Sequence, residues 1–326
     1  MKTKFGNRLT IFQNKITASQ RLGSGLLGFL PGFAMVFMAL SGVYGQGSKH
    51  PMFDRDTLFE TLSERWELDS ENYSGNFRIT SYKPTYILLG RWTSDTNKQP
   101  ASFNPDYVAE SPLALNTTEL KFQISFKTKI VRGLFFNNLD IWAAYTQKSH
   151  WQVYNAELSR PFRETNYEPE LIFNYGMNIP FLGFDIRMAG LALTHQSNGR
   201  SLPLSRSWNR VIFHMAMERE FWQIYLKPWI RLNDTDDENP EITNYYGRME
   251  GIISHQLGRT LITLEATHSL RFGSENRGSL RLGWSFPIDG YLRGHLEVFE
   301  GYGETLIDYN HRQFTIGFGV SIVEWQ

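Results

Sequence analysis

The feature that most constrains the fold of this chain is an alternation of apolar and polar side chains with a period of two. In the last alternating segment the apolar positions are Phe314, Ile316, Phe318, Val320 and Ile322. Successive side chains of a strand point to opposite faces, so each such segment predicts a strand with one dry face. About twelve segments of this kind follow one another along the chain. They lie near residues 76–92, 118–130, 138–155, 167–178, 184–197, 206–219, 221–232, 243–257, 260–271, 278–286, 289–302 and 311–322.

The even number and the length of these segments predict an all-β fold, a twelve-stranded antiparallel transmembrane β-barrel. A strand needs about 9 to 11 residues to cross an outer membrane. Aromatic residues make up 15% of the chain, and several of them fall near segment ends, as in barrels with aromatic girdles. The alternative is a soluble β-sandwich, because alternation alone shows only that one face is dry.

The first 45 residues have the organisation of an export signal. Basic residues precede any acidic one, an apolar run extends over residues 26–40, and small residues follow near residue 45. A membrane anchor is the alternative, but a spanning helix needs about 20 apolar residues, and this run is shorter and contains Pro31. We therefore expect a signal peptide over 1–45, a polar periplasmic segment over 46–75, and a barrel over 76–326 in the outer membrane.

Composition excludes several classes of function. The chain has 33 basic and 33 acidic residues, so no basic excess indicates a nucleic-acid partner. It has no cysteine, which excludes disulfides and thiolate chemistry. The polar faces of the predicted strands carry charges of both signs, which predicts ion pairs across a plugged lumen that conducts poorly. These charges are Lys121, Lys127, Lys227, Arg231, Arg248, Glu250, Arg293, His295 and Glu297.

A hairpin over residues 194–210 is the candidate active site. His195 and Ser197 lie two residues apart on one strand and therefore share a face. Pairing through the turn after Ser197 brings Asn209 beside His195. Ser197 would be the nucleophile, His195 the general base, and Asn209 the group that fixes the imidazole tautomer, which are the roles of a hydrolase triad.

The same parity predicts which face the triad occupies. His195 and Ser197 share their register with Leu193, and Asn209 shares its register with Phe213. We therefore expect the three polar groups to face lipid, where such groups are costly unless they are satisfied or functional. A His-x-Ser pair alone is a weak signal, since it usually belongs to an ordinary surface or packed strand.

The chain also resembles the outer-membrane phospholipase A family of Gram-negative bacteria. The resemblance rests on the two arms of the hairpin, residues 195–200 and 205–210, and on three further motifs. These motifs are PFRETNYEP at 161–169, KPW at 227–229 and GYGETLIDYN at 301–310. The resemblance implies a serine hydrolase that cleaves acyl esters of phospholipids and lysophospholipids, and that calcium and homodimerisation activate.

By motif, the resemblance assigns further residues to this site. The amide of Gly199 would form part of the oxyanion hole. Calcium would be held by the Arg200 carbonyl and Ser205 of one subunit and by Ser159 of the other. Gln147 would lie at the dimer interface, although an ordinary strand position is the alternative interpretation of that residue.

One departure concerns a secondary calcium site. The family has an aspartate three residues before the calcium-ligand serine, where this chain has Leu202, and its partner in the site matches Asp237. The departure counts against the secondary site and leaves the dimer site unaffected. Two other functions remain open from the residues: a non-enzymatic pore or structural barrel with a decayed site, and a lipase that acts on lipid A.

Overall fold

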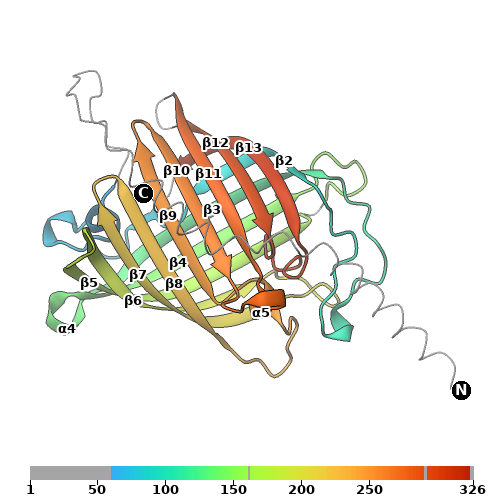
Figure 1. Ribbon diagram of the computed structural model, residues 1–326, viewed down its shortest axis with the longest axis horizontal. Helices are drawn as coiled ribbons and strands as arrows, with labels where there is room; N and C mark the ends of the chain where they lie inside the picture. Colours follow the sequence, from blue (N-terminus) through green and yellow to red (C-terminus); the bar gives the residue numbers. More distant parts are fainter. Residues whose placement is uncertain (1–59, 161, 290–291, 324–326) are drawn as a thin grey trace, which may run out of the picture. The chain divides into compact units, whose positions relative to one another are not determined.

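A closed β-barrel forms the described part of the protein. The computed structural model describes residues 60–160, 162–289 and 292–323. The predicted signal peptide and residues 46–59 lie outside the described residues. Strands β2 to β13 pair antiparallel with their sequence neighbours, and β13 pairs with β2 to close the sheet (Figure 1). The predicted all-β, twelve-stranded barrel is therefore confirmed.

Most of the strands are longer than a typical strand of a soluble protein. They are β1 Ile79–Ser81, β2 Thr85–Thr93, β3 Thr118–Gly133, β4 Leu139–Trp151, β5 Glu164–Phe181, β6 Phe184–Ser197, β7 Ser207–Arg219, β8 Trp222–Leu232, β9 Met249–Leu257, β10 Thr260–His268, β11 Gly278–Asp289, β12 Leu292–Gly301 and β13 Gln313–Val323.

In the described part of the chain, the helices are short and lie between strands or before them. They are α3 Leu62–Trp66, η2 Ser70–Asn72, η3 Pro105–Tyr107, α4 Leu134–Asn137, α5 Ile242–Tyr245 and η4 Gly273–Glu275. Among the described residues, none of these helices has the length and apolar character that crossing a bilayer would require.

The two ends of the barrel differ in the length of their connections. At one end, two-residue turns at 182–183, 220–221 and 258–259 join consecutive strands. At the other end, longer loops connect them; the 198–206, 233–248 and 302–312 loops are three of these. Short periplasmic turns and longer extracellular loops are the pattern of outer-membrane barrels. The hairpin of interest, β6 and β7, is joined by a loop at the extracellular end.

The barrel places its charges inside and its apolar side chains outside. On β3, Lys121 and Lys127 are fully buried, whereas Ile124 and Phe126 are 47% and 38% exposed. Inside the lumen, Nζ of Lys121 lies 2.6 Å from Glu297 and 2.8 Å from Glu304. These contacts agree with the prediction that charges of opposite sign pair across the lumen.

The segment that precedes the barrel strands packs inside it. A capping box between Thr61 and Glu64 begins α3, which buries Leu62 and Trp66 in a cluster with Trp142. The ring of Trp66 meets that of Trp142 edge to face at 5.7 Å. Residues 60–75, which the sequence presents as a polar periplasmic segment, thus contribute apolar side chains to the lumen.

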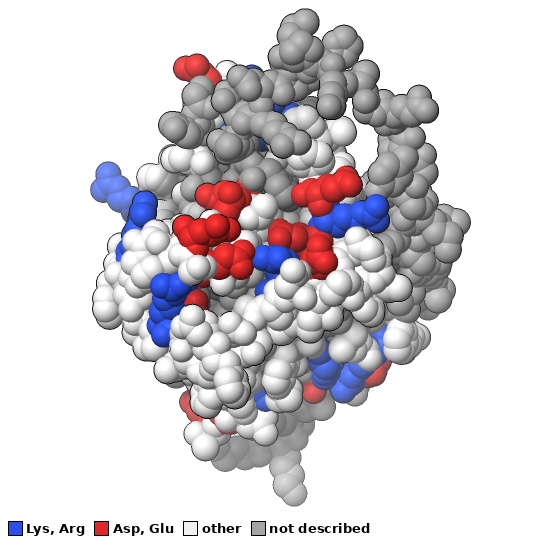
Figure 2. Space-filling view, turned by 90° about the vertical axis from the view of Figure 1, so that its left-hand side faces the viewer, with Lys and Arg blue, Asp and Glu red and all other residues white. Residues whose placement is uncertain are grey.

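Charged groups also gather where the barrel ends in short turns. Arg187 of β6 lies 3.3 Å from Asp69 and 3.4 Å from Glu218, and the backbone of Leu62 donates to the same Glu218. Figure 2 shows acidic and basic side chains close together near the centre of one face of the molecule. These contacts fasten the segment around α3 to strands β6 and β7.

The space left in the lumen is small. A cavity of about 100 Å³ remains, lined by charged side chains such as Lys83, Glu168 and Arg281. Charged side chains of both signs therefore line the space that remains. The prediction of poor conductance stays a prediction.

Two of the strand boundaries that differ from expectation have a local cause. The first segment divides into β1 and β2, because Pro84 lacks an N–H for the ladder and Lys83 turns inward to pair with Glu168 at 2.8 Å. Strand β9 begins only at Met249, because residues 242–245 form α5 and Gly247 has a φ of +116°.

Candidate active site

The β6–β7 hairpin has the register that parity predicts. Its Cα partners include His195 with Asn209 and Ser197 with Ser207. The inward set is buried, with Arg210 only 4% exposed, whereas Leu193 and Phe213 of the outward set are 45% and 44% exposed. His195, Ser197 and Asn209 belong to the outward set, as predicted.

A hydrogen bond joins two of the three candidate catalytic groups. Nδ1 of His195 lies 2.8 Å from Oδ1 of Asn209. An amide oxygen can only accept, so Nδ1 carries the proton in this arrangement. In neutral imidazole, Nε2 is then left as the proton acceptor. This is the tautomer that a general base needs.

Ser197 lies at the end of β6, on the same outward face as His195. Its Cα partner on the other side is Tyr167 of β5. Among the residues that the structure describes, no hydrogen bond joins Ser197 to His195. The contact between nucleophile and base is often loose in structures without substrate, and a strand spacing of about 6.6 to 6.8 Å between i and i+2 is within side-chain reach.

A buried asparagine organises the 198–206 loop that follows Ser197. Oδ1 of Asn198 accepts from the backbone N–H of Arg206 at 2.9 Å and of Arg200 at 3.3 Å. Its nitrogen donates to the Leu204 carbonyl at 2.8 Å and to Glu164 at 3.3 Å. One side chain that is 3% exposed therefore fixes both arms of the loop and ties them to β5.

The residue that follows Asn198, Gly199, must be a glycine. Gly199 has a φ of +62°, in the left-handed region that favours glycine. A β-carbon there would lie 2.9 Å from the ring of Tyr167, closer than normal packing allows. The backbone N–H of Gly199, two residues after Ser197, is thus presented by a tight turn.

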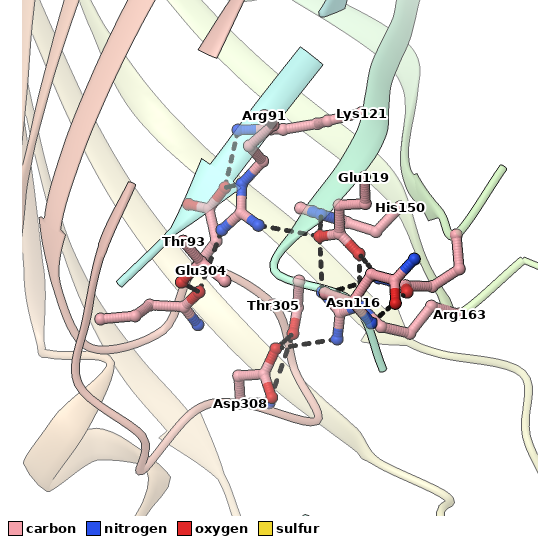
Figure 3. A network of polar contacts seen from close by, with 12 residues as sticks. Arg91, Thr93, Asn116, Glu119, Lys121, His150, Arg163, Glu304, Thr305 and Asp308 are labelled. Atoms are coloured by element: carbon pink, nitrogen blue, oxygen red, sulfur yellow. Dashed lines mark hydrogen bonds and ion pairs between the residues drawn. The ribbon is translucent and has the colours of Figure 1, made fainter. Parts of the chain in front are cut away.

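An ion-pair network anchors the loop from inside the barrel (Figure 3). The guanidinium of Arg200 donates to the Arg163 carbonyl at 2.7 Å. The guanidinium of Arg163 is itself held by Glu119 at 2.7 and 3.0 Å and by Asp308 at 3.1 Å. Burial alone would raise the pKa of Asp308, but Arg163 holds that pKa below its usual value. Charged groups from β3, from the loop between β4 and β5 and from the 302–312 loop therefore meet next to the 198–206 loop.

The residues assigned to calcium lie in two loops. Arg200 and Ser205 belong to the 198–206 loop, and Ser159 belongs to the loop between β4 and β5, where its carbonyl accepts from Trp151. Ser205 donates to Oε1 of Glu238 at 2.6 Å. The acidic neighbour of Ser205 is thus Glu238.

The secondary-site residues make other contacts. Asp237 forms an ion pair with Arg231, and Leu202 is 61% exposed. Nothing in these contacts joins Asp237 to the 198–206 loop.

Gln147 lies on β4, in the same row of the sheet as Ser197. It is paired with Tyr167, which is paired in turn with Ser197. Neighbouring strands are about 4.8 Å apart, so Gln147 lies about 10 Å from Ser197 along the outer surface. Its amide bonds Tyr145 and Ser149 at 3.1 and 3.2 Å.

Sequence reasoning missed three residues around the site: Glu164, Asp234 and Glu238. Glu164 bonds Asn198, Asp234 accepts from Asn209 at 3.2 Å, and Glu238 accepts from Ser205. Asp234 and Glu238 fall in an acidic stretch that is typical of a solvated loop. The sequence offered one clue to their role: this acidic stretch directly follows β8, the strand that pairs with Asn209.

Comparison with known proteins supports these observations. The family model described as Phospholipase A1 matches residues 62–322. Phospholipase A1 of Klebsiella pneumoniae is 36% identical over 77% of this chain and 85% of that protein. Phospholipase A1 of Escherichia coli K12 is 37% identical over 77% of this chain and 84% of its own length.

Solved structures agree with the sequence relatives. The outer-membrane phospholipase A of Escherichia coli superposes with a TM-score of 0.68 at 37% identity, covering 77% of this chain and all of that one. The Salmonella typhi outer-membrane phospholipase, described as a dimer with bound calcium, gives a TM-score of 0.69 at 35% identity and covers 77% and 95% of the two chains. The chain therefore belongs to the phospholipase A1 family, as a barrel enzyme of the outer membrane.

Proposed function

We propose that this phospholipase is a calcium-dependent serine hydrolase that cleaves acyl esters of phospholipids and lysophospholipids on the outer wall of its barrel. Ser197 attacks the ester carbonyl, and His195 takes the serine proton and later returns it to the leaving alcohol. Asn209 holds the imidazole in the tautomer that leaves Nε2 free to accept. The observation that carries the proposal is the 2.8 Å bond between His195 and Asn209 on the apolar outer face.

The position of these groups supports lipid as the substrate. Leu193 and Phe213 flank the site and present apolar surface, against which acyl chains pack. Polar groups on a lipid-facing surface are unfavourable unless they are functional or satisfied. A headgroup-proximal ester reaches this face without leaving the membrane.

Negative charge develops on the ester oxygen when the serine attacks. The backbone N–H of Gly199 is a fixed donor of the kind that stabilises such an oxyanion. Asn198 and the Arg163 network hold the turn in place, so the donor needs no rearrangement during the reaction. A bound calcium ion would supply positive charge for the same oxyanion.

The oxygen atoms around Ser205 fit a calcium ion, which prefers oxygen ligands. The Arg200 carbonyl and the Ser205 hydroxyl would hold it. The structure adds a carboxylate: Oε2 of Glu238 is buried and has no hydrogen-bond partner among the described residues, while Oε1 contacts Ser205. The bound calcium of the Salmonella typhi relative supports the same metal here.

Ser159 of a second copy would complete this calcium site, so that the enzyme is active as a homodimer. The Salmonella typhi relative is described as a dimer with bound calcium. Gln147 lies in the same row as Ser197 and faces outward, which is the geometry of an interface residue that brings the two copies together near the active serines.

The test is fatty-acid release from mixed micelles of phospholipid and detergent. Wild type is expected to be active with calcium and inactive with chelator, and Ser197→Ala is expected to be inactive in both. Glu238→Gln is expected to require more calcium for half-maximal activity. Equal hydrolysis by wild type and Ser197→Ala would exclude the mechanism, and large single-channel conductance without esterase activity would favour a pore.

A further inference from the structure

Asn209 has a second partner outside the proposed triad. Its oxygen accepts from Nδ1 of His195 at 2.8 Å, and its nitrogen donates to Oδ2 of Asp234 at 3.2 Å. One amide therefore links the imidazole to a carboxylate. We propose that Asp234 is a positioning residue for the reaction: it fixes the orientation of the Asn209 amide and, through it, the tautomer of His195. This inference rests on the proposed function.

The need for such a residue follows from the symmetry of an amide. The oxygen and NH₂ ends of asparagine have almost the same shape. In the reversed orientation, Asn209 would donate to Nδ1 of His195, and the ring proton would move to Nε2. The imidazole could then not accept the proton of Ser197. A carboxylate can only accept, so Asp234 selects the orientation in which the NH₂ end of Asn209 points toward the loop.

The chain path brings Asp234 to this place. Leu232, the last residue of β8, is the Cα partner of Asn209, so the chain leaves the sheet directly beside the amide. Asp234 follows two residues later. Its position is therefore set by the register of β7 and β8.

The rest of the loop is held by other contacts. Asn104 donates to the Asp237 carbonyl at 3.0 Å, and Ser102 donates to the Glu238 carbonyl at 2.7 Å. The hydroxyl of Tyr309 donates to the Pro240 carbonyl at 3.1 Å. Because these bonds do not involve the Asp234 side chain, its removal is expected to leave the loop in place.

The first experiment compares Asp234→Ala with Asp234→Asn in the micelle assay with calcium. Loss of the acceptor in Asp234→Ala is expected to lower kcat about tenfold, with KM for lipid nearly unchanged, because the bond acts on the base and not on lipid binding. Asp234→Asn keeps an acceptor oxygen but can also donate, so it no longer excludes the reversed amide, and its kcat is expected to lie between those of wild type and Asp234→Ala. The matched control is Asp236→Asn, which removes the same charge from the same loop but contacts Tyr107 instead of Asn209.

The second experiment exchanges the amide and the carboxylate between positions 209 and 234, so that the direction of their hydrogen bond is reversed. Asn209→Asp alone places two carboxylates against each other, which repel, and is expected to lose activity. In the double variant Asn209→Asp with Asp234→Asn, the new amide donates to the new carboxylate, which still accepts from His195. The double variant is expected to be more active than Asn209→Asp alone. Equal activity of these two variants would contradict the coupling.

Ser197→Ala separates this inference from the proposed function. If Ser197→Ala retains wild-type activity, the proposed function fails, whatever Asp234 does. If Ser197→Ala is inactive while Asp234→Ala matches wild type and Asp236→Asn in kcat, Asp234 has no positioning role and only this inference is overturned.

Discussion

Gly199 combines two constraints that a β-carbon would violate. Its φ of +62° lies in the left-handed region, and the ring of Tyr167 occupies the space in which the β-carbon would lie. Both constraints act on the backbone N–H proposed to stabilise the oxyanion. At the scale of single residues, we therefore propose that the backbone conformation of Gly199 affects the rate.

Gly199→Ala is expected to lower kcat by more than tenfold, because the turn must shift away from Tyr167 and carry its N–H with it. Gly258→Ala is the matched control: Gly258 has a φ of +60°, but a β-carbon added there would meet no atom within 4 Å, and this glycine lies in a turn at the other end of the barrel. It is expected to cost stability without changing kcat. Similar kcat values for the two variants would contradict the role of Gly199.

The residues of the candidate site differ in how far the sequence predicts them. His195, Ser197 and Asn209 lie on strands, where parity determines the face and a hairpin determines the register, so their placement follows from alternation. Asp234 and Glu238 lie in a loop whose path depends on contacts with distant segments. No local pattern encodes such contacts.

At the scale of elements, the 302–312 loop supports the 198–206 loop through Arg163. Asp308 accepts from Arg163 at 3.1 Å, from Thr305 at 2.8 Å and from Asn97 at 2.9 Å. The pKa of Asp308 in the folded protein is lowered below its ordinary value of 3.8. The folded state therefore prefers the ionised carboxylate, and this preference stabilises the barrel at neutral pH.

Asp308→Asn is expected to destabilise the folded protein by about 1 to 3 kcal/mol at pH 7, where the lost bonds involve a charged acceptor. A lowered folded-state pKa gives stability that is present above the ordinary pKa and is lost as the pH falls through the lowered one. The difference between wild type and Asp308→Asn should thus shrink as the pH falls below about 4. Thermal unfolding of both proteins in detergent, at pH 7 and below a pH of about 4, measures this difference. A difference that grows on acidification would contradict the stabilising role of the ionised Asp308.

Strands were predicted correctly where the alternation of apolar and polar residues is uninterrupted. The segment 184–197 coincides with β6, because alternation there is uninterrupted. The division at Pro84 and the late start of β9 reflect single residues that break the ladder. The packing of α3 in the lumen could not be predicted, since its five helical residues carry too short a pattern to show which face they bury.

At the scale of the whole molecule, the lumen is filled from both ends. Trp66 packs from one side against Trp142, and Glu304 of the 302–312 loop reaches Lys121 from the other. We expect purified protein in planar bilayers to show single-channel conductance far below that of wide porins, because these side chains fill the lumen from both ends and leave a cavity of about 100 Å³ among charged residues. Porin-like conductance would contradict a filled lumen.

The outward orientation of His195 and Asn209 has a kinetic consequence. The proposed site on the outer wall of the barrel would meet a membrane phospholipid by lateral diffusion in two dimensions. Turnover should then follow the mole fraction of phospholipid in the surface around the protein, so that adding inert detergent slows the enzyme even when the total lipid concentration is held constant.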